Sequence, residues 1–168
     1  MQWVLAPVKN VRKPPFNVLV SAYACNPFMG SEEGVGWDWV RAISRCAQAV
    51  VITAAHHRKD IEKALAEGSP FHHPVTFSYV PHRSWHYRPT AGWRFVERSL
   101  LKPAMNIAYQ LWLRDAYALA RKWCRRMDFR LLHQLTYVGF RFPGHLWKIP
   151  KPLVWGPVGG RSEERRVG

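Results

Sequence analysis

Glycines and acidic residues gather in one short stretch near the N-terminus, the segment CNPFMGSEEGVG at residues 25–36. Because Gly30, Gly34 and Gly36 lack a Cβ, backbone amides there can approach a ligand closely, where a following helix offers unpaired N–H groups. A phosphate or a sugar hydroxyl fits such a place, and Ser31 is a candidate N-cap for the helix. A flexible connection that needs glycine for its turn geometry explains the same spacing, so both interpretations stay open.

The two carboxylates in this stretch limit what it can bind. Glu32 and Glu33 favour a helix N-terminus through the helix dipole, but they repel a phosphate at close range. One of them is instead a candidate acceptor of hydrogen bonds from a sugar, and we assign this role to Glu33. The spacing G-x-x-x-G-x-G differs from the dinucleotide fingerprint G-x-G-x-x-G.

Histidines and cysteines offer little support for a metal site. His82 and His86 are four residues apart, and two further pairs are adjacent, but Pro81 and Pro89 interrupt a helix that would align the first pair. No metal is therefore expected. The chain has 3 cysteines, Cys25, Cys46 and Cys124, without a C-x-x-C pair, which favours neither a disulfide framework nor a thiolate zinc site and is typical of a reducing cytosol.

The elements that must position these residues alternate along the chain. Apolar runs predict buried strands at residues 17–24, 49–54, 75–80, 129–136 and 152–158. Between them, apolar spacing predicts a helix that buries Val35, Trp39, Ala42 and Cys46 and ends near Gln48, and a second helix over residues 59–67. A long amphipathic helix with a core stripe that includes Tyr109, Trp112 and Trp123 follows, and residues 143–148 predict a short one.

This alternation predicts an α/β fold: a three-layer domain with a parallel sheet of at least five strands, in the order 3-2-1-4-5. Parallel strands end at the same edge of a sheet, and ligands bind there where the strand order reverses. Residues 25–36, 133–141 and 156–160 each lie at the C-terminal end of a predicted strand. We therefore expect these three segments to meet at one edge.

The charge of the chain favours anionic partners. The 168 residues carry 25 Lys and Arg against 11 Asp and Glu, a net charge of +14. The segment 81–94 (PHRSWHYRPTAGWR) mixes basic and aromatic residues, which suits a glycan or an anionic membrane surface, or a solvated loop whose aromatic side chains pack on the sheet. Neither a secretory leader nor a run of about 18 apolar residues is found, so we expect a cytoplasmic protein, with peripheral attachment to the inner membrane face as an option.

Two segments and their separation carry a resemblance over nearly the whole chain. LVSAYACNPFMGSEEGVGWDWV and LLHQLTYVGFRFPGHLWKIPKPLVWGPVGG resemble the N-terminal half of a family 4 glycosyltransferase with the GT-B fold. The resemblance implies two Rossmann-like domains facing across a cleft, the first holding the acceptor and the second most of the nucleotide-sugar donor. It implies sugar transfer with retention of configuration, no metal and no prosthetic cofactor.

The resemblance also implies roles for individual residues. His133 would sit near the reacting centre as the catalytic candidate, although Leu135 stands where many relatives carry a second histidine. A strand histidine that binds a backbone carbonyl is the structural alternative for His133. The residues expected to approach the donor phosphates and sugar are Gly30, Ser31, Gly34, Gly36, Gly159 and Gly160, and those expected on the acceptor side are Glu33, Thr136, Tyr137 and Arg141.

The same resemblance divides the chain into three parts. Residues 1–16 form a basic lead-in and residues 17–160 the glycosyltransferase domain. Residues 161–168 (RSEERRVG) resemble a translated sequencing adapter, which suggests a gene fragment from metagenomic assembly. The C-terminal donor-binding domain would then be missing, and the fragment is expected to be inactive alone.

Two other function classes remain as alternatives. A Rossmann-type oxidoreductase should show G-x-G-x-x-G and an acidic residue at the end of the second strand, where this chain has Ala54, Ala55 and His56. A nucleic-acid-binding module is suggested by charge alone, but the basic residues scatter and form no recognised motif. Nucleic acid is therefore not an expected partner.

Overall fold

The computed structural model describes residues 16–81, 98–137 and 143–157, with only the backbone described for residues 98–105. Its elements follow the order β1 (Phe16–Ala22), α1 (Ser31–Ile43), β2 (Ala47–Ala54), η1 (Ala55–His57), α2 (Arg58–Glu67), β3 (Val75–Val80), α3 (Arg98–Arg126), β4 (Leu131–Leu135), η2 (Leu146–Lys148) and β5 (Leu153–Trp155). The predicted strands are all present, and most differ from the expected ranges by a few residues at their ends.

The sheet confirms the predicted fold class. Its five strands lie in the order β3-β2-β1-β4-β5, and every neighbouring pair is parallel. β1 is central, with Val20 opposite Val51 on β2 and His133 on β4. The strand order reverses between β1 and β4, so the C-terminal ends of these two strands define the switch point of the fold.

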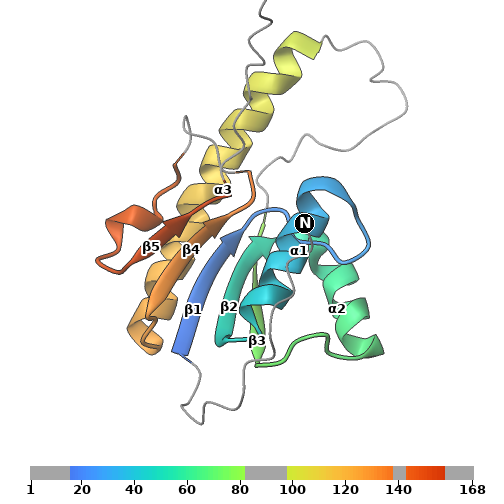
Figure 1. Ribbon diagram of the computed structural model, residues 1–168. Coiled ribbons are helices and arrows are strands. Elements are labelled where there is room, and N and C mark those ends of the chain that lie inside the picture. The colour runs from blue at the N-terminus through green and yellow to red at the C-terminus, as the bar shows by residue number, and fades with distance from the viewer. Residues whose placement is uncertain (1–15, 82–97, 138–142, 158–168) are drawn as a thin grey trace, which may run out of the picture.

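Helices cover both faces of the sheet and make three layers. In Figure 1, α1 and α2 lie on one face and the long α3 crosses the other. One core cluster joins α1 and α2 to the sheet through Trp37, Val40 and Ile61, and the other joins α3 through Trp112 and Phe129. The predicted core stripe of α3 is confirmed, because Tyr109 and Trp112 are buried and Trp123 packs against the same cluster.

The prediction for the buried face of α1 is wrong. Val35 and Trp39 are each 42% exposed, and the residues that face the sheet are Gly36, Trp37 and Val40. The helix also ends at Ile43, earlier than Gln48. The spacing was ambiguous because α1 carries two apolar stripes, and only the stripe that brings the large Trp37 ring against Phe71 and Phe77 is buried.

Two smaller expectations also need correction. Gly30 takes the N-cap position of α1 without a side-chain hydrogen bond, and Ser31 is the first helical residue, so Ser31 is not the N-cap. Ser31 has a φ of 56°, whereas an N-cap residue typically lies in the β region. The short helix expected over residues 143–148 is a single 3-10 turn, Leu146–Lys148.

Candidate functional site

The loop that follows β1 is held in place by a buried asparagine. Asn26 is 1% exposed, and its amide nitrogen donates to Asp60 Oδ2 at 2.7 Å and lies 3.3 Å from His57 Nδ1. Its Oδ1 accepts from the N–H of Phe28, and its own N–H donates to the carbonyl of Glu33. Asn26 therefore ties the end of β1 to the first turn of α1 and to the start of α2.

Packing explains two of the three glycines in residues 25–36. A Cβ on Gly36 would lie 2.0 Å from the carbonyl oxygen of Ala24 and 3.0 Å from the methyl group of Thr136. Only glycine allows α1 to approach the chain this closely. A Cβ on Gly34 would lie 2.6 Å from the carbonyl oxygen of Met29, whereas Gly30 is exposed and has no atom in reach of an added Cβ. The donor-binding roles of these glycines stay predictions, and Gly30 is the one whose surroundings are open.

The chain that leaves β4 has an unusual backbone. Thr136 and Tyr137 have φ values of 60° and 49°, and with Ser31 they are the non-glycine residues of positive φ in the described chain. This region is unfavourable for most side chains, above all for a β-branched threonine. All three positions lie at the C-terminal edge of the sheet, and strained backbone of this kind concentrates at functional sites.

Hydrogen bonds join the loops after β1 and β4 directly. A carboxylate oxygen of Glu32 accepts from the N–H of Tyr137 at 2.7 Å, and the hydroxyl of buried Thr136 accepts from the N–H of Ala24 at 3.1 Å. The expected meeting of residues 25–36 with residues 133–137 is thereby confirmed. Since the Glu32 carboxylate is engaged with Tyr137, Glu33 is the better candidate for accepting a hydrogen bond from a ligand.

His133 lies beside the third segment. His133 is 5% exposed, and its Nε2 lies 2.8 Å from the carbonyl oxygen of Gly156, just past β5. Burial lowers the pKa of His133, while the hydrogen bond to Gly156 acts in the opposite direction. The edge of the Trp39 ring packs against the imidazole. These contacts are those of the structural alternative, a strand histidine bound to a backbone carbonyl, and the catalytic role stays a prediction.

Aromatic rings pack together at the C-terminal edge of the sheet, beside the loops after β1 and β4. Tyr23 packs edge-on against Tyr109, Trp112 and Tyr137. Tyr137 is 48% exposed, so its ring borders solvent, and its carbonyl accepts a hydrogen bond from the Tyr109 hydroxyl. Burial raises the pKa of Tyr23 to about 12, with smaller contributions from Tyr137 and from the negative charge of Glu33. The phenols therefore stay neutral hydrogen-bonding groups at physiological pH.

Sequence reasoning missed the most connected residues of this edge. Asn26 and Asp60 were not selected, and His57 appeared only as one of a histidine pair considered for metal. A signal was available, since Asn26 follows β1 by a few residues and His57 follows β2, and both are polar side chains where ligand-side loops begin. Burial lowers the pKa of His57 to about 4, and the neighbouring His56 adds to this effect.

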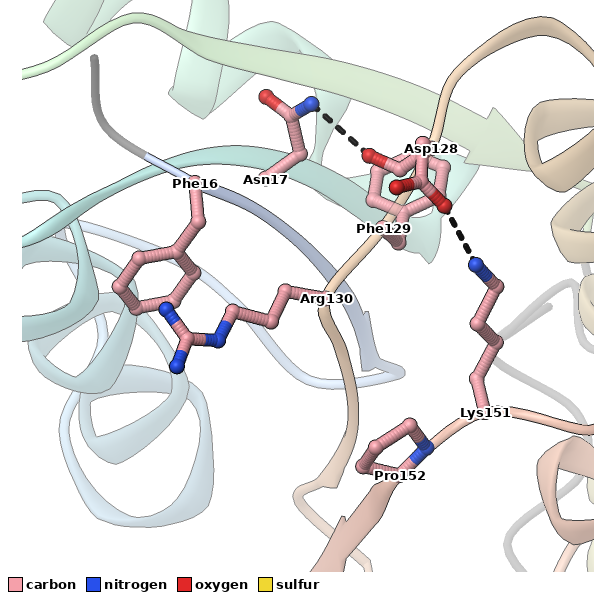
Figure 2. Close-up of a pocket in the computed structure, with 7 residues that line it drawn as sticks. All are labelled: Phe16, Asn17, Asp128, Phe129, Arg130, Lys151 and Pro152. Atoms are coloured by element: carbon pink, nitrogen blue, oxygen red, sulfur yellow. Dashed lines mark hydrogen bonds and ion pairs between the residues drawn. The ribbon is translucent and has the colours of Figure 1, made fainter. Parts of the chain in front are cut away.

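A surface pocket lies at the opposite edge of the sheet. It has a volume of about 440 Å³ and is lined by residues at the starts of β1, β4 and β5, among them Phe16, Arg130 and Pro152 (Figure 2). Arg130 stacks on Phe16, and Lys151 pairs with Asp128. Ligands of open parallel sheets bind at the C-terminal ends of strands, so this pocket is not the predicted site.

Several predicted residues lie outside the described part of the chain. Arg141, Gly159, Gly160, His82, His86 and the rest of the basic, aromatic segment up to residue 94 are among them, as are residues 1–15 and 161–168. Within the described residues no group of three or more His, Cys, Asp and Glu side chains has the arrangement of a metal site. The helices described there include none long and apolar enough to cross a membrane.

Comparisons with protein-family models, with curated proteins and with solved structures gave no match for this chain.

Proposed function

We propose that this chain is the acceptor-side domain of a retaining glycosyltransferase that uses a nucleotide-sugar donor. The observation that carries the proposal is the junction of the loops after β1 and β4 at the switch point, where Tyr137 binds Glu32. These loops contain the two motifs that resemble family 4 glycosyltransferases. The proposal includes a second, donor-binding domain that faces this edge across a cleft.

Glycosyl transfer needs an acceptor hydroxyl placed against the anomeric carbon and stabilisation of charge on the leaving diphosphate. In the proposed arrangement the exposed ring of Tyr137 is the surface on which a sugar ring stacks. Glu33 accepts a hydrogen bond from the acceptor, because Glu32 already binds the Tyr137 N–H. Its negative charge also raises the pKa values of Tyr23 and Tyr137, in addition to the effect of burial.

Donor binding would use the N-terminus of α1, at the end of the loop after β1. No side chain caps the N-terminus of α1, so its first N–H groups are not satisfied by a side-chain cap. Gly30 and Ser31 are exposed there. Glu32 and Glu33 oppose a phosphate placed close to the helix, so in this proposal the transferred sugar lies nearer to α1 than the diphosphate does. His133 contributes by holding the Gly156 carbonyl.

The test joins this chain to the donor-binding domain that the proposal requires, taken from the source gene. We expect the joined protein to transfer or slowly hydrolyse at least one nucleotide sugar from a broad panel. Glu33→Gln should lower that rate by about tenfold or more, the scale of losing one well-placed hydrogen bond to a charged group. A matched exposed change, Glu67→Gln at the end of α2, is the control. A joined protein that folds and turns over none of the panel would contradict the proposal.

A further inference from the structure

Helix α1 carries a second apolar stripe that the sheet does not use. Val35 and Trp39 lie one turn apart, and both are 42% exposed. Ala42, three residues further along the helix, is exposed as well. The sheet-facing residues Trp37 and Val40 form the other stripe. A surface helix normally has one apolar stripe, so the second one needs a partner of its own.

The second stripe borders a part of the sheet that lacks a helix. The edge of Trp39 contacts the ring of His133, so α1 reaches β4 on this face. His133 pairs in register with Val154 on β5, which puts Val154 on the same face, and Val154 is 45% exposed. In Figure 1, α1 and α2 lie over β1 to β3, and no described helix lies over β4 and β5 on that side. Parallel sheets are ordinarily covered on both faces.

At the N-terminal end of the strands, the same face of the sheet carries an exposed aromatic ring and a basic side chain. Val18 and Val20 pack beneath α1, so strand alternation places Phe16 on the same face. Phe16 is 36% exposed, and the guanidinium of Arg130 lies 5.2 Å from its ring centroid. The chain as a whole carries a net charge of +14.

We propose that the α1–β5 surface, defined by Val35, Trp39 and Val154, docks an acidic amphipathic helix. The helix would lie beside α1 over β4 and β5, with apolar residues at i, i+3 or i+4 and i+7 against this surface. Its acidic flanks would face Arg130 and the positive field of the domain. A second copy of this chain fits less well, because it would bring a second net charge of +14 to the contact. This inference does not depend on the proposed glycosyltransferase activity.

The experiment selects helices against the full 168-residue chain. A phage library displays a 16-residue helical scaffold with random residues, and selection uses the wild-type chain. We expect enriched peptides to show the apolar spacing above with Asp or Glu on the flanks. Trp39→Glu and, separately, Val154→Glu should weaken their binding by about tenfold or more, as expected for centrally buried contacts. Exchange of the acidic flanks for Lys should weaken binding as well.

Matched controls distinguish peptide binding at this surface from nonspecific binding and from misfolding of the variants. Trp147→Glu and Ile107→Glu make the same kinds of change at side chains that are 59% and 62% exposed, and both should leave binding unchanged. Val35→Glu replaces Trp39→Glu if circular dichroism shows that the latter has lost its fold. Three results would overturn the proposal: enriched peptides without the spacing, equal binding by folded Trp39→Glu, or a dimer in sedimentation that Trp39→Glu dissociates.

Discussion

The N–H of Tyr137 donates a 2.7 Å hydrogen bond to the carboxylate of Glu32, a residue 105 positions earlier in the chain. This contact closes the C-terminal edge of the sheet between the loops after β1 and β4. Glu32→Gln keeps the side-chain shape but replaces a charged acceptor by a neutral one. We expect a loss of about 1 kcal/mol of unfolding free energy and faster amide exchange at Tyr137.

Hydrogen exchange followed by NMR tests this expectation. The matched control is Glu62→Gln, which removes an exposed pair with Arg58 within α2 and should leave both the stability and the Tyr137 amide essentially unchanged, because solvent screens exposed ion pairs. Unchanged protection of the Tyr137 amide in Glu32→Gln would mean that the two loops are held together by other contacts.

Gly36 tests the close approach of α1 to the end of β1. Gly36→Ala adds a methyl group 2.0 Å from the carbonyl oxygen of Ala24, so the helix must shift, and we expect destabilisation by about 1–3 kcal/mol. Gly30→Ala meets no atom within 4 Å at an ordinary φ of −87°, so its effect should stay within about 0.5 kcal/mol. Urea unfolding of both variants gives the comparison. Equal free energies of unfolding for the two would show that α1 does not pack as described.

A substitution of Asn26 tests whether this side chain holds the loop after β1 against α1 and α2. Asn26→Ala removes the bonds to Asp60 and to the Phe28 N–H from a fully buried position, and we expect a loss of about 2–3 kcal/mol. Asn17→Ala is the control, since Asn17 makes one exposed bond to the carbonyl of Asp128 and should cost about 1 kcal/mol or less. If denaturant midpoints shift equally in both variants, Asn26 does not hold the loop after β1 in place.

The buried His57 makes the free energy of unfolding depend on pH. Its folded-state pKa of about 4 lies below the ordinary value of 6.5, so the unfolded chain binds the proton more readily. The contribution of neutral His57 is therefore fully present above pH 6.5 and is lost as pH falls towards 4. His57→Gln should flatten the fall of unfolding free energy over this range by up to about 3 kcal/mol. NMR titration of the His57 ring should give a midpoint near 4, and a midpoint above 6 would refute the burial described here.

The arrangement of the strands could be predicted from the sequence because each buried strand is a compact apolar run and parallel crossovers have one hand. The meeting of residues 25–36 with residues 133–137 followed from that topology. The buried face of α1 could not be predicted, because Val35 and Trp39 repeat as regularly as Trp37 and Val40 do, and only packing against Phe71 and Phe77 decides between them. The places of Asn26 and His57 just after β1 and β2 were a signal for polar residues at this edge. The bond from Asn26 to Asp60 could not be predicted, since it joins residues 34 positions apart that share no spacing pattern.

The central claim is that the edge formed by the loops after β1 and β4 binds sugars, and NMR titration of the full chain tests it most directly. Nucleotide sugars and glycan acceptors are added in turn to labelled protein. We expect the amide signals of Gly30, Ser31, Glu33 and Tyr137 to shift in a saturable way, with those of Phe16 and Arg130 at the opposite edge unchanged. Saturable shifts confined to Phe16, Arg130 and Lys151, or no saturable shift with any compound, would contradict the claim.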